Sequence, residues 1–171
     1  MPALQWSDAL ALDLPFMDDT HREFVELLAA VAASPDDTLL AAWQTLIDHT
    51  DEHFSREDRW MQDTRFSSSN CHSVQHQVVL QVMREGARRG LDGAPGVVRQ
   101  MARELAVWFP QHAQSMDAAL ALHLRRVGYD PVSGQVHAPA ALPADVIHGC
   151  GGASCSDPAP ATAGARDALS A

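Results

Sequence analysis

The feature that most constrains the fold of this chain is a set of histidines and carboxylates spaced to lie on inner helix faces. In chain order the set is His21, then His53 with Glu57, His72 with His76, and His112 with Asp117. An α-helix turns about 100° per residue, so residues four apart lie about 40° apart around its axis and about one turn along it. The first two pairs therefore each project from one helix face. The pattern predicts helices that turn these polar groups toward a common interior.

Apolar residues recur with the period of amphipathic helices in four segments. The first begins near Met17 or Asp18, after Pro15, and ends before Ser34. The others cover residues 36–63, 71–89 and 95–127, separated by stretches of turn-forming residues. Short connections between long helices favour antiparallel neighbours. We therefore predict an all-α, up-down-up-down four-helix bundle.

Polar groups buried at the centre of such a bundle need compensation. Removing a charge from water costs several kcal/mol unless another charge offsets it. One buried histidine is more often a hydrogen-bonded core residue than a ligand, so a purely polar core is the alternative. Five histidines with two carboxylates instead favour bound metal cations. Imidazole and carboxylate suit iron, and they also bind zinc, manganese or cobalt.

The sequence around these residues resembles the hemerythrin family, particularly its bacterial members, over roughly residues 10–127. The matching stretches are Asp19-Thr-His21 with Phe24, His53-Phe-Ser-Arg-Glu57 with Met61, Cys71-His72-Ser-Val-Gln-His76, and Trp108 four residues before His112. A single H-x-x-x-H would be weak support. Four such segments in this order, at separations that fit successive helices, are specific.

The resemblance implies a four-helix bundle that holds two iron ions joined by an oxygen bridge from solvent. Carried over residue by residue, the implied ligands are His72, His76 and His112 for one ion, His21 and His53 for the other, and Glu57 and Asp117 as bridges. The second ion keeps an open position, where the family binds dioxygen in an apolar pocket. Candidates to line this pocket are Phe24, Phe54, Trp108 and Leu120, with plain core packing as the alternative.

The spacing of His112 and Asp117 departs from a simple helical face. Five residues apart, they would lie about 140° from each other on an ideal helix. Either they reach different sides of a metal pair, or the helix is distorted between them. Pro110 lacks a backbone donor and favours a kink just before the site.

Composition limits the remaining possibilities. The formal net charge of the 171 residues is −10, which argues against nucleic acid or an anionic membrane as a partner. Without a long apolar run or a signal-like N-terminus, a cytoplasmic location is expected. We expect a bundle over residues 1–128 and a flexible Ala/Pro/Gly-rich tail over 129–171. In that tail Cys150 and Cys155 could form a disulfide, bind a soft metal with His148, or be incidental.

The predicted function is reversible dioxygen binding for storage, delivery or scavenging, with dioxygen as the ligand and no protein partner identified. One alternative is an oxygen or redox sensor that acts through the tail. Another is a di-iron enzyme that handles peroxide or nitric oxide, which would need a proton donor such as His49 or Thr20 beside the site. Iron storage or repair without dioxygen binding is a further possibility.

Overall fold

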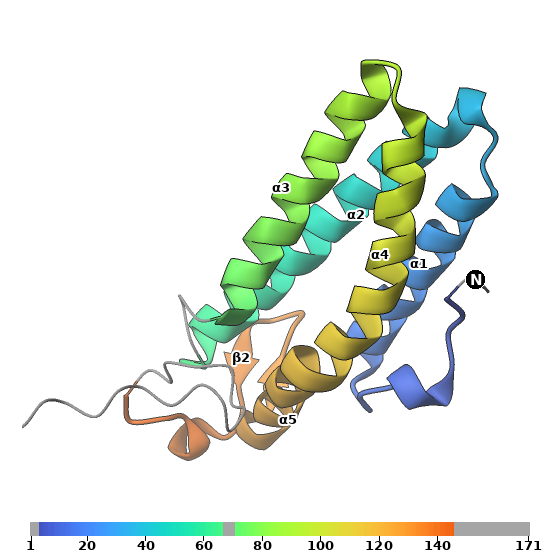
Figure 1. Cartoon of the computed structure of the whole chain (residues 1–171). Coiled ribbons are helices and arrows are strands. Elements are labelled where there is room, and N and C mark those ends of the chain that lie inside the picture. Colours follow the sequence, from blue (N-terminus) through green and yellow to red (C-terminus); the bar gives the residue numbers. More distant parts are fainter. Residues whose placement is uncertain (1–3, 67–70, 146–171) are drawn as a thin grey trace, which may run out of the picture.

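The computed structural model describes residues 4–66 and 71–145 and forms the predicted all-α bundle (Figure 1). Its long helices are α1 (Pro15–Ala33), α2 (Asp36–Asp63), α3 (Cys71–Leu91) and α4 (Pro95–His112). A π-helical turn, η2 (Ala113–Asp117), joins α4 to a shorter helix, α5 (Ala118–Val127). The remaining elements are the 3-10 turns η1 (Asp8–Leu10) and η3 (Pro139–Ala141) and the strands β1 (Tyr129–Asp130) and β2 (Gln135–Val136). None of the helices in the described part has the length and hydropathy of a bilayer-spanning segment.

The start of α1 differs slightly from the prediction. The helix begins at Pro15 itself, because proline fits the first helical position, where its missing N–H is not needed. The Asp18 carboxylate accepts hydrogen bonds from the backbone N–H groups of Leu12 and Leu14, at 2.7 and 3.1 Å. These bonds fix the segment that leads into α1. The bounds of α2 are those predicted, and α3 continues to Leu91.

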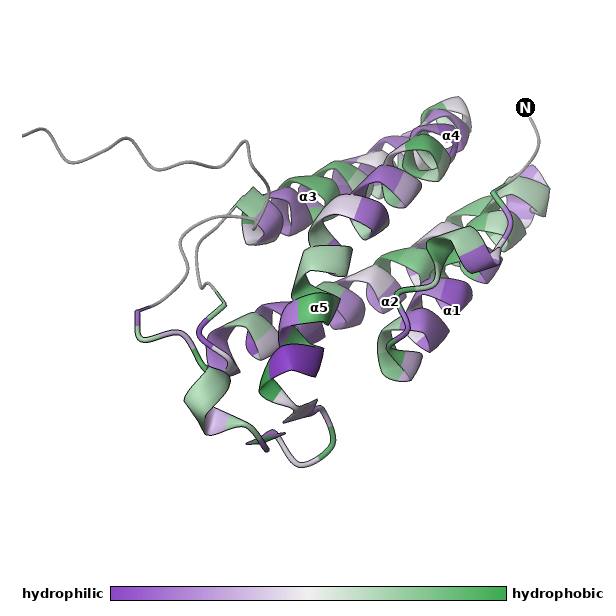
Figure 2. Cartoon of the chain, turned by 90° about the horizontal axis from the view of Figure 1, so that it is seen from below, coloured by the Kyte–Doolittle hydropathy of each residue, from purple (hydrophilic) through white to green (hydrophobic). Residues whose placement is uncertain are grey.

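The long helices form a ring in which each contacts the next and α4 closes against α1. Seen from below, α1 and α2 lie on one side, α3 and α4 on the other, and α5 crosses between them (Figure 2). The predicted single helix over residues 95–127 is thus interrupted. It runs unbroken through Pro110, and the irregularity follows at η2, where α5 leaves the direction of α4 (Figure 1).

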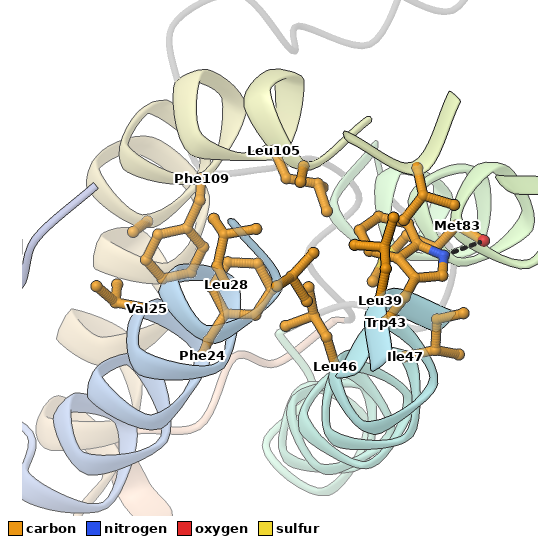
Figure 3. Close-up of a cluster of buried hydrophobic side chains, with 14 of the residues drawn as sticks. Phe24, Val25, Leu28, Leu39, Trp43, Leu46, Ile47, Met83, Leu105 and Phe109 are labelled. Atoms are coloured by element: carbon orange, nitrogen blue, oxygen red, sulfur yellow. Dashed lines mark hydrogen bonds between the residues drawn. The ribbon is translucent and has the colours of Figure 1, made fainter. Parts of the chain in front are cut away.

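Two hydrophobic clusters fill the bundle. The first lies among α1 to α4 and includes Phe24, Leu28, Leu39, Trp43, Leu46, Met83, Leu105 and Phe109 (Figure 3). The second lies where α5 packs on α1 and α2 and includes Leu14, Met17, Trp60, Met61, Leu120 and Leu124. In chain order, His21 falls between Met17 and Phe24, and the His53–Glu57 pair falls between Leu46 and Trp60. The fold therefore holds a polar layer between two apolar ones.

The chain stays packed beyond residue 128, where the sequence suggests a flexible tail. Strands β1 and β2 pair antiparallel, with Tyr129 opposite Val136. Tyr129 is buried in the second cluster and its hydroxyl donates to Asp63 at 2.8 Å. Leu142 also packs on this cluster. The described part of the tail, up to residue 145, thus adds to the apolar layer below the polar one.

Tight packing of α3 gives a first prediction. A Cβ at Gly90 would lie 2.5 Å from Cδ2 of Leu40 and 3.1 Å from Cγ2 of Val98. We expect Gly90→Ala to lower the free energy of unfolding by about 1–3 kcal/mol, since two branched side chains must shift. Urea unfolding at equal metal content measures this. The control is Gly96→Ala in the first turn of α4, where a Cβ meets nothing within 4 Å. It should be neutral or stabilising by up to about 1 kcal/mol. Equal stability of the Gly90 variant and wild type would contradict this packing.

Candidate metal centre

The structure brings all seven predicted residues together in the polar layer. They come from every long helix, and each is at most 2% exposed: His21, His53, Glu57, His72, His76, His112 and Asp117. All five histidines turn Nε2 toward the two carboxylates, at distances between 2.9 and 3.8 Å. Nε2 of His76 and His112 lie 3.3 Å apart. Two overlapping groups of these residues have ligand atoms close enough to hold an ion each.

The carboxylate oxygens divide the histidines into two sets. Oε1 of Glu57 lies 3.1 Å from Nε2 of His53, whereas Oε2 lies 3.5 Å from Nε2 of His72. Oδ2 of Asp117 lies 3.3 Å from His21, and Oδ1 lies 2.9 Å from His72. Each carboxylate thus presents one oxygen to each set, as a bridging ligand would. The three-histidine position (His72, His76, His112) has five protein donor atoms, and the two-histidine position (His21, His53) has four.

The π-helical turn explains how His112 and Asp117 share one site. In η2 the backbone N–H of Ala118 bonds to the carbonyl of Ala113, five residues earlier. This widened turn brings residues five apart to nearly the same face, which an ideal α-helix would not do. Nε2 of His112 accordingly lies 3.1 Å from Oδ1 of Asp117. The distortion suggested by the sequence spacing is present, but it lies between the two residues and not at Pro110.

In each imidazole, Nδ1 is the outer nitrogen, the one turned away from the two carboxylates. Within the described residues, only two of the five outer nitrogens have a polar partner. The Nδ1–H of His76 donates to Asp58 at 3.0 Å, and that of His112 donates to Oε1 of Gln75 at 3.3 Å. Ring stacking holds the same two histidines: Phe54 lies on His76 with centroids 3.9 Å apart, and Trp108 lies on His112 at 4.4 Å. Nδ1 of the other three histidines has no hydrogen-bond partner there.

The electrostatics of the metal-free centre show that it requires positive charge. Burial alone would lower the pKa of His21 and His72, but contact with Asp117 and Glu57 outweighs this and raises the two values to about 9 and about 10. Burial would raise the pKa of Glu57, yet the neighbouring imidazoles, His53 foremost, hold it well below its usual range. The pKa of Asp117 is also strongly lowered, against the effects of burial and of Glu57, by His112 and His21. Two ionised carboxylates thus remain in the core.

The donor set fits metal ions better than it fits a hydrogen-bonded network. Five of the converging atoms make no hydrogen bond of acceptable geometry among the described residues: Nε2 of His21 and of His72, Oε2 of Glu57, and both carboxylate oxygens of Asp117. Unsatisfied buried polar atoms are costly and call for a missing partner. Imidazole nitrogen and carboxylate oxygen are suitable ligands for iron. Residues of this chain could therefore hold one ion in each position.

Beyond the seven candidate ligands, the sequence analysis considered His49 and Thr20 as proton donors beside the site. The hydrogen bonds of His49 and Thr20 are made to backbone carbonyls and not to the candidate ligands: Nε2 of His49 lies 3.2 Å from the Thr20 carbonyl, and the Thr20 hydroxyl donates to the Phe16 carbonyl. Among the residues near the centre, sequence reasoning missed Asp58 and Phe109. Phe109 lies edge-on to His21 at 5.2 Å, and its position three residues before His112 could have signalled this.

Of the apolar residues proposed to line a pocket, Phe24, Phe54 and Leu120 are buried and Trp108 is half-buried, and their contacts differ. Phe24 stacks on Phe109, at 4.5 Å between centroids, beside the two-histidine position. Phe54 and Trp108 lie on ligands of the three-histidine position. Leu120 is fully buried in the second cluster. Both positions are thus enclosed by apolar side chains.

Cys71 precedes His72 at the start of α3 and is disulfide-bonded. His148, Cys150 and Cys155, which were considered as a redox or metal motif, lie outside the described residues.

Comparison with known proteins supports one family. The family described as "Hemerythrin HHE cation binding domain" matches residues 12–122. A bacteriohemerythrin of Ralstonia nicotianae is 38% identical over 130 residues, which cover 76% of this chain and 95% of the relative. A myohemerythrin of Sipunculus nudus is 29% identical over 112 residues, covering 66% and 86%. A bacteriohemerythrin of Stenotrophomonas maltophilia is 23% identical, covering 78% and 92%. No solved structure gives a significant match.

The raised pKa values of His21 and His72 predict how the metal-free protein responds to pH. Folding favours their protonated forms, so this stabilisation is full below the unfolded pKa of 6.5 and is lost as pH rises through about 9 and about 10. We expect the free energy of unfolding to fall by a few kcal/mol over this range. The pKa of His76 is also raised, by Asp58 and Glu57 against the effect of burial, so His76 contributes in the same direction, and the chain has no lysine to titrate there. Urea unfolding of chelator-treated protein measures this fall.

The metal-loaded protein is the control for this titration. Metal ions displace the protons from these imidazoles, so the loaded protein should show a much weaker pH dependence over the same range. Constant or rising stability of the metal-free form between about pH 6.5 and about pH 10 would contradict the assigned charge state of the centre.

Proposed function

Because the chain belongs to the hemerythrin family, we propose that it binds dioxygen reversibly at a di-iron centre in the polar layer. Members of this family bind a di-iron centre, and the buried cluster of this chain can hold metal. We further propose that the three-histidine position holds one iron, that His21 and His53 hold the other, and that Glu57 and Asp117 bridge them. The use of the bound dioxygen would be storage, delivery or scavenging.

The unequal donor sets are the observation that supports this proposal most directly. The protein offers five atoms to the three-histidine position and four to the two-histidine position. The latter thus keeps more of its coordination sphere free for an exogenous ligand. When bound, the di-iron centre supplies the electrons for reversible dioxygen binding. The protein contributes the arrangement of donors and the unequal access to them.

The surroundings of the two-histidine position favour a carrier over an enzyme. Phe109 lies edge-on to His21, and Phe24 stacks on Phe109, so aromatic rings lie behind His21 on the side of the first cluster. An enzyme that cleaves an O–O bond needs a proton donor close to the reacting atoms. Thr20 and His49, the residues considered for this role, make their hydrogen bonds elsewhere. An apolar enclosure that withholds protons favours release of dioxygen unchanged.

Substitution of single histidines tests the ligand assignment. His72→Ala and His53→Ala should each reduce metal content, because each removes a donor from one position and leaves buried carboxylate charge uncompensated. The matched control is His49→Ala, one turn before His53 on α2, which should keep full occupancy. Metal analysis of the purified proteins measures the result. Full occupancy in both ligand variants would refute the assignment.

Exposure of anaerobically reduced protein to dioxygen tests the function. We expect two irons per chain and an absorption band that forms with dioxygen and disappears when the gas is removed. Irreversible oxidation on first exposure, or rapid peroxide turnover by the loaded protein, would contradict the carrier proposal and favour a sensor or an enzyme. Zinc in place of iron would contradict the di-iron proposal as well.

A further inference from the structure

The five imidazoles of the centre differ in the hydrogen-bond partner of Nδ1, and His76 differs from the other four. His76 donates its Nδ1–H to the carboxylate of Asp58 at 3.0 Å. His112 has only a neutral amide oxygen as its partner, at 3.3 Å. Nδ1 of His21, His53 and His72 has no hydrogen-bond partner in the described part of the chain. Among the described residues, His76 is therefore the one imidazole of the centre whose Nδ1 meets a carboxylate, and it belongs to the three-histidine position.

The contact between Asp58 and His76 follows from the geometry of α2. Asp58 comes directly after Glu57, so its side chain is turned about 100° away from the bridging position and toward α3. It lies in a pocket between α2 and α3 that is also lined by His76, Asp51 and Arg84. The Asp58 side chain is 30% exposed, whereas that of His76 is 1% exposed. The carboxylate thus reaches the buried ring from the solvent side.

Two contacts fix the His76 ring in one orientation. Phe54, one turn before Asp58 on the same helix, stacks on the ring with an angle of 5° between the planes. Asp58 binds the ring edge at Nδ1. With its face and outer edge held, His76 points Nε2 at Oε2 of Glu57, 3.4 Å away. Rotation of the ring would break both contacts.

We propose that Asp58 is a positioning residue that orients His76 and makes it the most strongly donating imidazole of the centre. A carboxylate bonded to the outer N–H of a ligating histidine raises the basicity of that ligand. The three-histidine position would then be the more electron-rich of the two, and its ion would hold the higher oxidation state more firmly. This inference rests on the proposed iron ligands, but it does not depend on dioxygen binding.

Asp58→Asn in the full chain tests the proposal, because it removes the charge and preserves the side-chain shape. The first readout is metal affinity, measured anaerobically by titrating metal-free protein with Co²⁺ against a competing chelator. We expect the affinity for one of the two ions to fall about 10- to 100-fold. The second readout is the midpoint potential of the iron-loaded protein. It should rise by about 59 mV for each tenfold loss of preference for the oxidised ion.

Asp51→Asn is the matched control. Asp51 lines the same pocket and its loss changes the net charge equally, but it pairs with Arg84 at 2.8 Å and makes no bond to a histidine of the centre. It should leave both readouts at the wild-type values. Asp58→Glu keeps the carboxylate, so this variant should retain most of the wild-type metal affinity and a midpoint potential close to the wild-type value. This rescue also guards against a general folding defect in the Asn variant.

The outcomes separate this inference from the proposed function. If the protein binds two ions and the Asp58 and Asp51 variants behave alike, the positioning role is refuted and the di-iron carrier stands. If the Asp58 variant alone shifts affinity and potential while the wild type does not bind dioxygen reversibly, the positioning role holds and the carrier function fails.

Discussion

Two ionised carboxylates in the middle of a helical bundle are the constraint on which the rest of this structure depends. Glu57 and Asp117 are fully buried, and their pKa values are depressed, so they keep their charge. Charge of this kind inside a protein must be met by charge of the opposite sign. When cations are bound, the five imidazoles act as neutral ligands. When cations are absent, imidazoles of the centre take up protons instead. Their convergence on two carboxylates makes the centre of the bundle a place for cations.

The two apolar clusters give this centre its chemical character. They lie on either side of the polar layer and leave solvent little access to it. Electrostatic interactions are stronger where water is excluded, so small differences between donors matter more there. The single carboxylate behind His76 is such a difference. The two positions therefore differ in what lies behind their histidines as well as in their number of donors.

Much of this arrangement could be predicted from the sequence, because a spacing of four residues on a regular helix fixes a common face. That reasoning placed His53 with Glu57 and His72 with His76, and it gave the bounds of α2 without error. Spacing left open whether Asp117 shares a face with His112, since a π-helical turn depends on packing that spacing alone does not encode, and the family resemblance supplied this pair. The sequence reasoning missed Asp58, whose role depends on the distance between α2 and α3. The packing of Tyr129 was not predicted, because the segment that follows it is rich in Ala, Pro and Gly and was expected to be flexible.

The origin of the donors in every long helix has a kinetic consequence. No single loop or lid covers the polar layer in the described part of the chain; the helices themselves enclose it. An ion held there cannot leave by the opening of one segment, because its ligands belong to elements that pack on one another along their length. Its departure requires concerted separation of helices, which is an event of the same kind as unfolding. Exchange of the ions with solution should therefore be as slow as the opening of the bundle, however moderate the affinity at equilibrium.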